Sequence, residues 1–177
     1  MSRAWPVEGV RADRPLGDMA RRILAVRVAE VYSFRPIVQR PEAVEATHAL
    51  RIALKRLRYT LELFAGVFGD AGARQIDRVK ALQETLGNLH DLDVRLDLIH
   101  AVAETTTNET SGKATGKRPG HADEAVGAGL LRYAGRERDR RRALHRDFVA
   151  QWNAFQQAGM RQELVALSQW TPGRTSE

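Results

Sequence analysis

The chain has 177 residues, which is long enough for one domain to bury a hydrophobic core without metals or disulfides. It contains no cysteine, which excludes a disulfide framework, a thiol nucleophile and a cysteine zinc site, and fits a reducing compartment. Its 28 lysines and arginines exceed its 22 acidic residues, and the net charge of +6 favours an acidic partner: nucleic acid, a phosphate polymer or anionic lipid. No segment has the apolar length of a signal peptide or a transmembrane helix, so we expect a cytoplasmic protein with no membrane partner.

Helical periodicity dominates the sequence, and the six prolines lie outside the long periodic segments. Pro36 is expected to end the first helix, and Pro41 stands at a favoured first helical position of the second. The pattern predicts four long helices and a short one, with bounds near 17–35, 41–68, 71–103, 130–157 and 160–168.

The predicted fold class is all-α, an antiparallel four-helix bundle in which each helix turns an apolar stripe inward. We expect residues 16–170 to form this bundle, preceded by a flexible arm at 1–15 and followed by a tail at 171–177. Residues 104–129 are rich in Thr, Gly and charge with few large apolar side chains, so they are interpreted as a mobile loop.

The second predicted helix carries two neighbouring stripes. Its apolar stripe has spacings of three and four and comprises Leu50, Leu54, Leu57, Leu61, Phe64 and Phe68. A cationic stripe lies about a quarter turn or more away and comprises His48, Arg51, Lys55 and Arg58, with Glu62 at its far end. Like charges stacked along a helix cost stability, so the stripe needs carboxylates from another helix or a functional role, and both interpretations stay open.

The third predicted helix has an apolar stripe that contains a carboxylate, Asp93, between Leu89 and Leu96. An unpaired carboxylate there is costly. Asp91 is only two residues away, and residues two apart on a helix do not face each other, which argues against a catalytic acid and base pair. Asp91 and Asp93 are therefore predicted to be structural partners that fix arginines in place.

In the fourth predicted helix, Arg141 falls within the apolar sector, and Arg138 and His145 flank it. One interpretation is that these residues hold a phosphate chain lying between helices. The other is that Arg141 only pairs with Asp93 or Glu137, because a buried arginine always needs an anion.

Two motifs together resemble the CHAD family, the conserved histidine alpha-helical domain. The first is carried by His48, Arg51, Lys55, Arg56, Leu57 and Arg58, and the second by Leu86, Gly87, Asp91, Asp93 and Val94. Both occur in the family's order and spacing, and Lys80 and Gln83 also resemble family positions. The resemblance is strongest over residues 42–99.

The resemblance implies a helical domain that binds inorganic polyphosphate on a basic surface, with no established catalytic activity and no cofactor. The residues predicted to bind the polymer are His48, Arg51, Lys55, Arg56, Arg58, Lys80, Arg138, Arg141 and His145. The family's usual domain has two repeats of the helical unit, whereas this chain has one set of motifs. We therefore expect a homodimer that rebuilds the two-repeat arrangement, and association with polyphosphate granules.

The residues also bear on nucleic-acid binding, on phosphate chemistry and on metal binding. A nucleic-acid-binding helical protein is the main alternative, although the cationic stripe lacks interleaved aromatic residues for base stacking and no helix-turn-helix pattern is evident. A phosphate-transferring or phosphate-cleaving enzyme would need a Gly-rich phosphate loop or an acidic metal cluster, and the sequence offers neither. The five histidines show no close ligand spacing, so no metal site is predicted.

Overall fold

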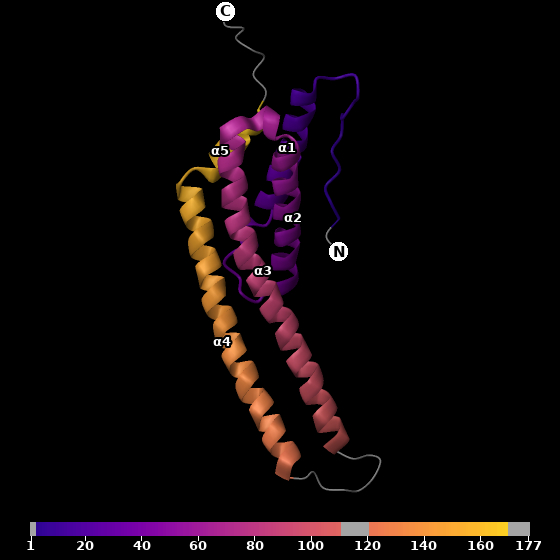
Figure 1. Ribbon diagram of the computed structural model, residues 1–177, viewed down its shortest axis with the longest axis vertical. Coiled ribbons are helices and arrows are strands. Elements are labelled where there is room, and N and C mark those ends of the chain that lie inside the picture. Colours follow the sequence, from indigo (N-terminus) through magenta and orange to yellow (C-terminus); the bar gives the residue numbers. More distant parts are fainter. Residues whose placement is uncertain (1–2, 111–120, 170–177) are drawn as a thin grey trace, which may run out of the picture. The chain divides into compact units, whose positions relative to one another are not determined.

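The computed structural model describes residues 3–110 and 121–169, and every regular element in these ranges is a helix (Figure 1). The elements in chain order are α1 (Leu16–Tyr32), the short 3₁₀ helix η1 (Arg35–Ile37), α2 (Val44–Leu63), α3 (Ala65–Thr110), α4 (His121–Gln157) and α5 (Met160–Ser168). The prediction of an all-α helical fold is confirmed. None of the described helices combines the length and apolar character needed to cross a bilayer.

Several helix bounds differ from the sequence prediction. α2 begins at Val44 rather than near Pro41 and ends at Leu63 rather than at Phe68, and α3 begins at Ala65 rather than near residue 71. α1 ends at Tyr32, and Pro36 lies inside η1 rather than directly after the helix. α3 continues through Thr110, and α4 begins already at His121. The predicted loop at 104–129 was therefore too long, because Thr and Gly lower helix propensity without forbidding a helix. Residues 111–120 of that loop and the predicted tail at 171–177 lie outside the described residues.

Two glycines set the junctions between helices. Gly69 has φ 53° and ψ −149°, so the backbone leaves the helical conformation near the start of α3, one residue after the predicted end of the preceding helix. Gly159 has φ 81° and separates α4 from α5. Both conformations favour glycine because a Cβ atom is disfavoured at positive φ.

The chain divides into two compact units: Met1–Leu86 with Phe148–Glu177, and Gly87–Asp147. The residues of the predicted single bundle, 16–170, thus belong to two units. The boundaries between the units fall inside α3 and α4, so each of these helices has one part in each unit. We call them the first and the second unit and describe each by itself.

The first unit is a helical bundle in which α1 packs against α2 and α5 (Figure 1). The predicted apolar stripe of α2 is buried except for Phe64, which is partly exposed. Leu24 of α1, Leu82 of α3, Phe148 of α4 and Leu164 of α5 are also buried in the core. Each fully buried side chain of this kind contributes about 1.5–3 kcal/mol to stability.

Polar contacts supplement this core. The Tyr32 hydroxyl donates a hydrogen bond to Gln156 Oε1 over 3.0 Å, and burial raises the pKa of the tyrosine. Thr85 Oγ1 of α3 contacts Gln151 Oε1 of α4 at 3.1 Å. These contacts join α1 and α3 to the end of α4.

The second unit is a pair of helices formed by the later part of α3 and the earlier part of α4, which lie side by side in Figure 1. Its small core comprises Leu96 and Ile99 of α3 and Ala134 of α4, with Leu130 partly buried against them. Two helices bury less apolar surface than a bundle, and Val94 and Leu98 remain 54% and 64% exposed.

Candidate functional site

The predicted cationic stripe runs along α2 in the first unit. Its members are spaced by three or four residues on a continuous helix, so Arg51 and Arg58 lie two turns, about 10 Å, apart. Lys80 of α3 joins them, because its Nζ and the Arg58 Nε each lie 3.7 Å from Glu62 Oε1. We call His48, Arg51, Lys55, Arg58 and Lys80 the basic stripe.

Arg51 and Lys55 lie in the middle of the stripe and form no ion pair or side-chain hydrogen bond with any residue that the structure describes. Both side chains are partly buried. The Arg51 Nε is fully buried and has no hydrogen-bond partner within the described chain. Its positive charge is thus held against the helix surface without a carboxylate opposite it.

Arg58 and Lys80 share one acidic neighbour, Glu62, which is 37% exposed. Both distances of 3.7 Å are longer than a direct hydrogen bond, so each ion pair is weak. The Arg58 guanidinium also lies 4.9 Å from the ring centroid of Tyr59. Stacking on an aromatic ring holds a guanidinium in place while its edges remain available to phosphate oxygens.

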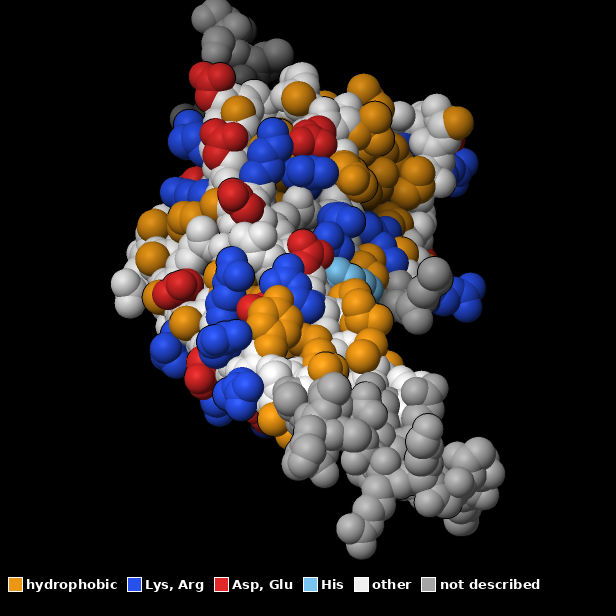
Figure 2. Space-filling view, turned by 60° about the horizontal axis from the view of Figure 1, so that its bottom comes forward, with side chains coloured by type: hydrophobic (Ala, Val, Ile, Leu, Met, Phe, Trp, Pro, Cys, Tyr) orange, Lys and Arg blue, Asp and Glu red, His pale blue; other side chains and the backbone are white. Residues whose placement is uncertain are grey.

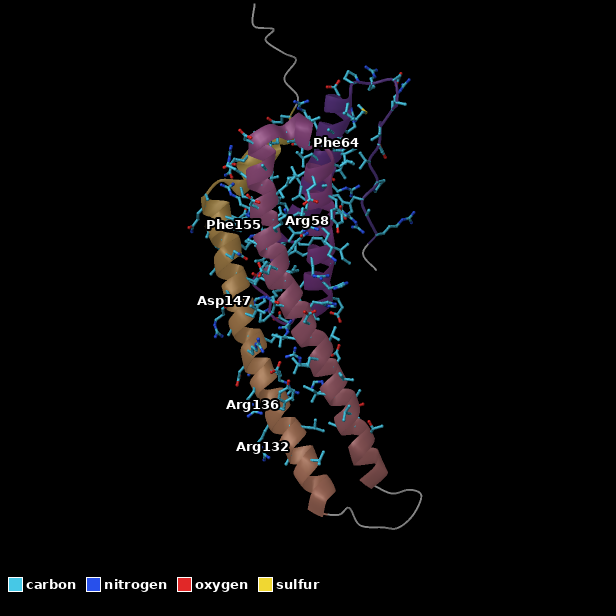
Figure 3. The ribbon with its side chains drawn as sticks, in the orientation of Figure 1. Arg58, Phe64, Arg132, Arg136, Asp147 and Phe155 are labelled. Atoms are coloured by element: carbon cyan, nitrogen blue, oxygen red, sulfur yellow. The ribbon has the colours of Figure 1, made fainter. Side chains whose placement is uncertain are left out.

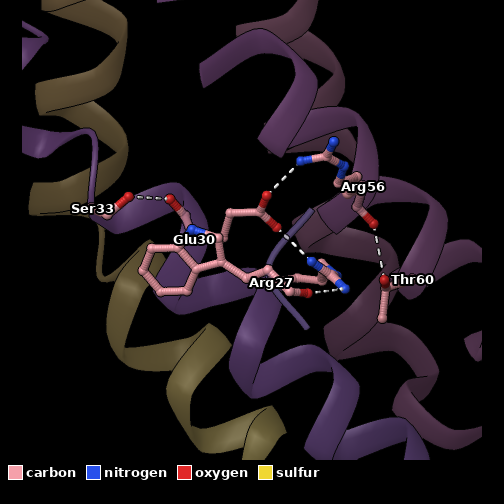
Figure 4. Close-up of polar contacts among 6 residues, drawn as sticks. Arg27, Glu30, Ser33, Arg56 and Thr60 are labelled. Carbon is pink, nitrogen blue, oxygen red and sulfur yellow. Dashed lines mark hydrogen bonds and ion pairs between the residues drawn. The ribbon is translucent and has the colours of Figure 1, made fainter. Parts of the chain in front are cut away.

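Arg56 points to a different side of α2 from the stripe. Its Nη1 donates to Glu30 Oε1 of α1 over 2.5 Å, and Arg27 Nη1 donates to Glu30 Oε2 over 2.6 Å (Figure 4). Glu30 is buried at 1% exposure, so two guanidinium groups neutralise one buried carboxylate. We call these three residues the Glu30 cluster. That Arg56 binds phosphate stays a prediction, and its guanidinium is already bound to an anion.

The second unit contains the other predicted arginine site. Arg141 Nε donates to Asp93 Oδ1, and both side chains are almost buried. Asp93 is one of the two carboxylates considered for Arg141 in the sequence, and the pairing with it is present. Glu137 instead accepts a hydrogen bond of 2.8 Å from Arg95, which raises the pKa of that arginine.

The remaining predicted residues of the second unit are not brought together. Arg138 is exposed and its Nη2 lies 2.5 Å from Nε2 of His100, whereas His145 is buried at 5% exposure. Asp91 is exposed and forms no ion pair with any residue that the structure describes, and its role as a structural partner of an arginine stays a prediction. Its position two residues from Asp93 directs it away from Arg141.

Asp91 instead lines a cavity of about 370 Å³ in the second unit, together with Asp147, Arg95 and Arg140. Figure 3 labels Asp147 on α4, with Arg136 and Arg132 earlier on the same helix. Figure 2 shows one face of the molecule, on which Lys and Arg side chains are prominent and carboxylates lie among them. Within the described residues no three His, Asp or Glu side chains group as metal ligands would.

Two residues beside the arginines of α2, Glu30 and Tyr59, were not predicted from the sequence. Glu30 is the clearer of the two. The sequence signal that could have revealed it is a carboxylate next to the apolar residue Val31, on the side of the first helix that is buried. Tyr59, 55% exposed beside Arg58, was also missed, since the stripe was expected to lack aromatic neighbours.

Residues 3–100 match the CHAD domain. The chain belongs to the CHAD domain family. The match includes α1, α2 and most of α3, and hence the whole basic stripe, Asp91 and Asp93. It ends before α4, which carries Arg138, Arg141 and His145. CHAD domains bind inorganic polyphosphate in general.

No match was found among curated proteins or among solved structures.

Proposed function

We propose that this CHAD protein binds inorganic polyphosphate through the basic stripe, without a catalytic step. The single observation that supports this most strongly is the charge balance of the stripe: Arg51, Lys55, Arg58 and Lys80 have one described carboxylate, Glu62, among them. A polyanion along the stripe supplies the missing negative charge. Because helices fix the cations, less side-chain entropy is lost on binding than with a flexible basic tail.

The stripe, rather than the second unit, is the centre of this proposal. Arg141 is bound to Asp93 and His145 is buried, so neither offers a free cation to a ligand without rearrangement. Arg138 is exposed and is proposed as a secondary contact.

The decisive experiment replaces Arg51 and Arg58 with Glu and measures binding of long-chain polyphosphate by calorimetry. Two charge reversals in the stripe should weaken binding at least about 100-fold, because charge-assisted contacts are replaced by repulsion. Circular dichroism should show unchanged helicity. Binding equal to that of the original protein would place the site elsewhere.

The matched control replaces Arg40 and Arg74 with Glu. Both arginines are exposed, lie in the first unit and have no ion pair with the described residues. The control changes the net charge by the same amount but lies outside the basic stripe. Because salt screens distant charges, its affinity for polyphosphate should fall less than about threefold at moderate salt. An equal loss in both variants would indicate non-specific attraction by net charge.

Salt dependence gives a second test. Binding that releases counterions weakens linearly on a plot of log affinity against log salt, with a slope of roughly −0.7 per neutralised phosphate on a single strand. Arg51→Gln should make that slope shallower by about this amount. A slope that does not change would exclude Arg51 from contact with phosphate.

Nucleic acid is the second candidate ligand, and exposed Tyr59 favours it because bases stack on aromatic rings. Polyphosphate has no rings to stack. Tyr59→Ala should therefore reduce binding of single-stranded nucleic acid and leave polyphosphate binding within about twofold. Competition between the two polymers then identifies the preferred ligand.

We also propose that two copies associate and place two basic stripes on one polymer, consistent with the single set of family motifs. Val94 and Leu98 of α3, one turn apart and exposed, offer apolar surface for such a contact. Light scattering should give twice the monomer mass at micromolar concentration. A stable monomer would contradict this part of the proposal, while the charge reversals would still test the basic stripe.

Polyphosphate binding would in turn bring the protein to polyphosphate granules in the cytoplasm.

A further inference from the structure

A second concentration of arginines lies in the first unit, where the N-terminal arm meets the beginning of α1. A cavity of about 570 Å³ is lined there by Arg11, Arg14, Arg21 and Arg22, and Asp18 is the one carboxylate among its lining residues. None of these residues belongs to the basic stripe or to the Glu30 cluster. We call these four residues the arginine pocket.

Most of the positive charge in this pocket is not neutralised. Arg11 is bound to Asp13 through two hydrogen bonds of 3.0 and 2.9 Å. Arg14, Arg21 and Arg22 form no ion pair with any carboxylate in the part of the chain that the structure describes. Three guanidinium groups thus face one cavity with a single carboxylate, Asp18, between them.

Two glycines make room for these guanidinium groups. A Cβ atom on Gly17 would lie 2.9 Å from Arg21 Nη1, and one on Gly9 would lie 3.1 Å from Arg22 Nη1. Both distances are too short for an ordinary contact, so a larger residue at either position would displace the arginine. The two glycines therefore leave space into which the ends of these side chains extend.

The start of α1 adds to the positive potential of the pocket. Pro15 precedes the helix and provides no side-chain hydrogen bond to the amides of the first turn. Such amides carry a partial positive charge and commonly bind phosphate oxygens. The helix end thus adds to the attraction of the guanidinium groups for an anion.

We infer that the arginine pocket binds a compact phosphate-type oxyanion, of the size of pyrophosphate, independently of the basic stripe. Planar guanidinium groups suit phosphate oxygens through paired hydrogen bonds, and the cavity has room for two linked phosphate groups. The oxyanion is either free pyrophosphate or the end group of a phosphate chain.

The test uses the full chain with Arg51→Glu and Arg58→Glu, so that the basic stripe does not contribute. Inorganic pyrophosphate is added while the amide signals of Gly9 and Gly17 are followed by nuclear magnetic resonance. We expect saturable shifts at one equivalent per chain. Absence of saturable shifts at millimolar pyrophosphate would overturn the inference.

Arg14→Ala with Arg22→Ala should weaken this binding at least about tenfold, as expected for the loss of charge-assisted hydrogen bonds. Both arginines are exposed, so the fold should persist, which the melting temperature checks. The matched control, Arg40→Ala with Arg74→Ala, removes two exposed arginines elsewhere in the same unit and should bind as before. Equal affinity of the two variants would show that the pocket is not the site.

A comparison of ligands separates the two sources of the oxyanion. If the pocket holds a chain end, a phosphate polymer capped at both ends should lose affinity for the pocket while uncapped polymer and pyrophosphate retain it. If capped polymer, uncapped polymer and pyrophosphate all bind with the same affinity per chain, the inference that the pocket recognises a compact oxyanion is wrong. Failure of the stripe variant to lose polymer binding would contradict the proposed function and leave the pocket result intact.

Discussion

Two sides of α2 carry basic residues in different surroundings: on one side they are bound to a carboxylate, and on the other they are not. On the side toward α1, Arg56 is bound to the buried carboxylate of Glu30, which also holds Arg27. On the basic stripe, Arg51 and Lys55 have no described carboxylate, although Lys55 directly precedes Arg56 in the sequence. The position of carboxylates on neighbouring helices, rather than the number of arginines, therefore determines which cations can serve a ligand.

The difference has an energetic basis. A buried carboxylate is tolerated only when cations and hydrogen bonds surround it, so the Glu30 cluster is required by the fold. A partly exposed cation is hydrated and needs no partner to be stable. The first side of α2 is thus expected to contribute to stability, and the second side is the one proposed to bind the polymer.

The largest effect is expected from Glu30→Gln, which leaves Arg27 and Arg56 partly buried without an anion. We expect a loss of about 3 kcal/mol in the free energy of unfolding, measured by urea denaturation. Glu45→Gln, an exposed carboxylate of α2, should change it by less than about 0.5 kcal/mol. Similar values for both variants would mean that the Glu30 cluster does not stabilise the fold.

A paired comparison of Arg51→Gln and Arg56→Gln should sharpen the contrast between the two sides. Arg51→Gln should reduce polyphosphate affinity about tenfold and change stability by less than about 0.5 kcal/mol. Arg56→Gln should show the reverse, with a loss of about 1–2 kcal/mol in stability and little change in the affinity of the folded protein. If Arg56→Gln weakens binding as much as Arg51→Gln does, the predicted contact of Arg56 with phosphate is real and the division between the two sides fails.

The smallest effect is expected from Glu62→Gln. It removes the carboxylate that lies 3.7 Å from both Arg58 and Lys80, so the basic stripe becomes more positive. Since exposed ion pairs contribute about 0.2–1 kcal/mol, polyphosphate affinity should rise by a factor of about 1.4 to 5 at low salt. Glu84→Gln, on an exposed position of α3, is the control, and weaker binding by the Glu62 variant would contradict the role given to the stripe.

The sequence predicted the helices and the stripe because both depend on periodicity within one segment. The buried leucines of α2 and the row from His48 to Arg58 follow from spacings of three and four alone. The partner of Arg56 could not be predicted in this way, because Glu30 lies 26 residues away on another helix. The arginine pocket was missed for a similar reason: it depends on how an irregular arm folds back on α1, and irregular backbone carries no periodicity.

The interpretation of residues 104–129 as one loop shows a different limit. Composition indicated a lack of core side chains, and the helices nevertheless extend to Thr110 and from His121. The end of a helix needs few buried residues, so it is not marked by apolar periodicity.

Arg27 also connects the buried cluster to the first residues of the chain. Its Nη2 donates a hydrogen bond of 3.1 Å to the carbonyl oxygen of Trp5, while its Nη1 is held by Glu30. An enzyme such as trypsin, which cuts after arginine, needs the arm released before it can act at Arg11 or Arg14. We therefore expect the lifetime of this outer segment under proteolysis to depend on the carboxylate of Glu30, which holds Arg27 in place.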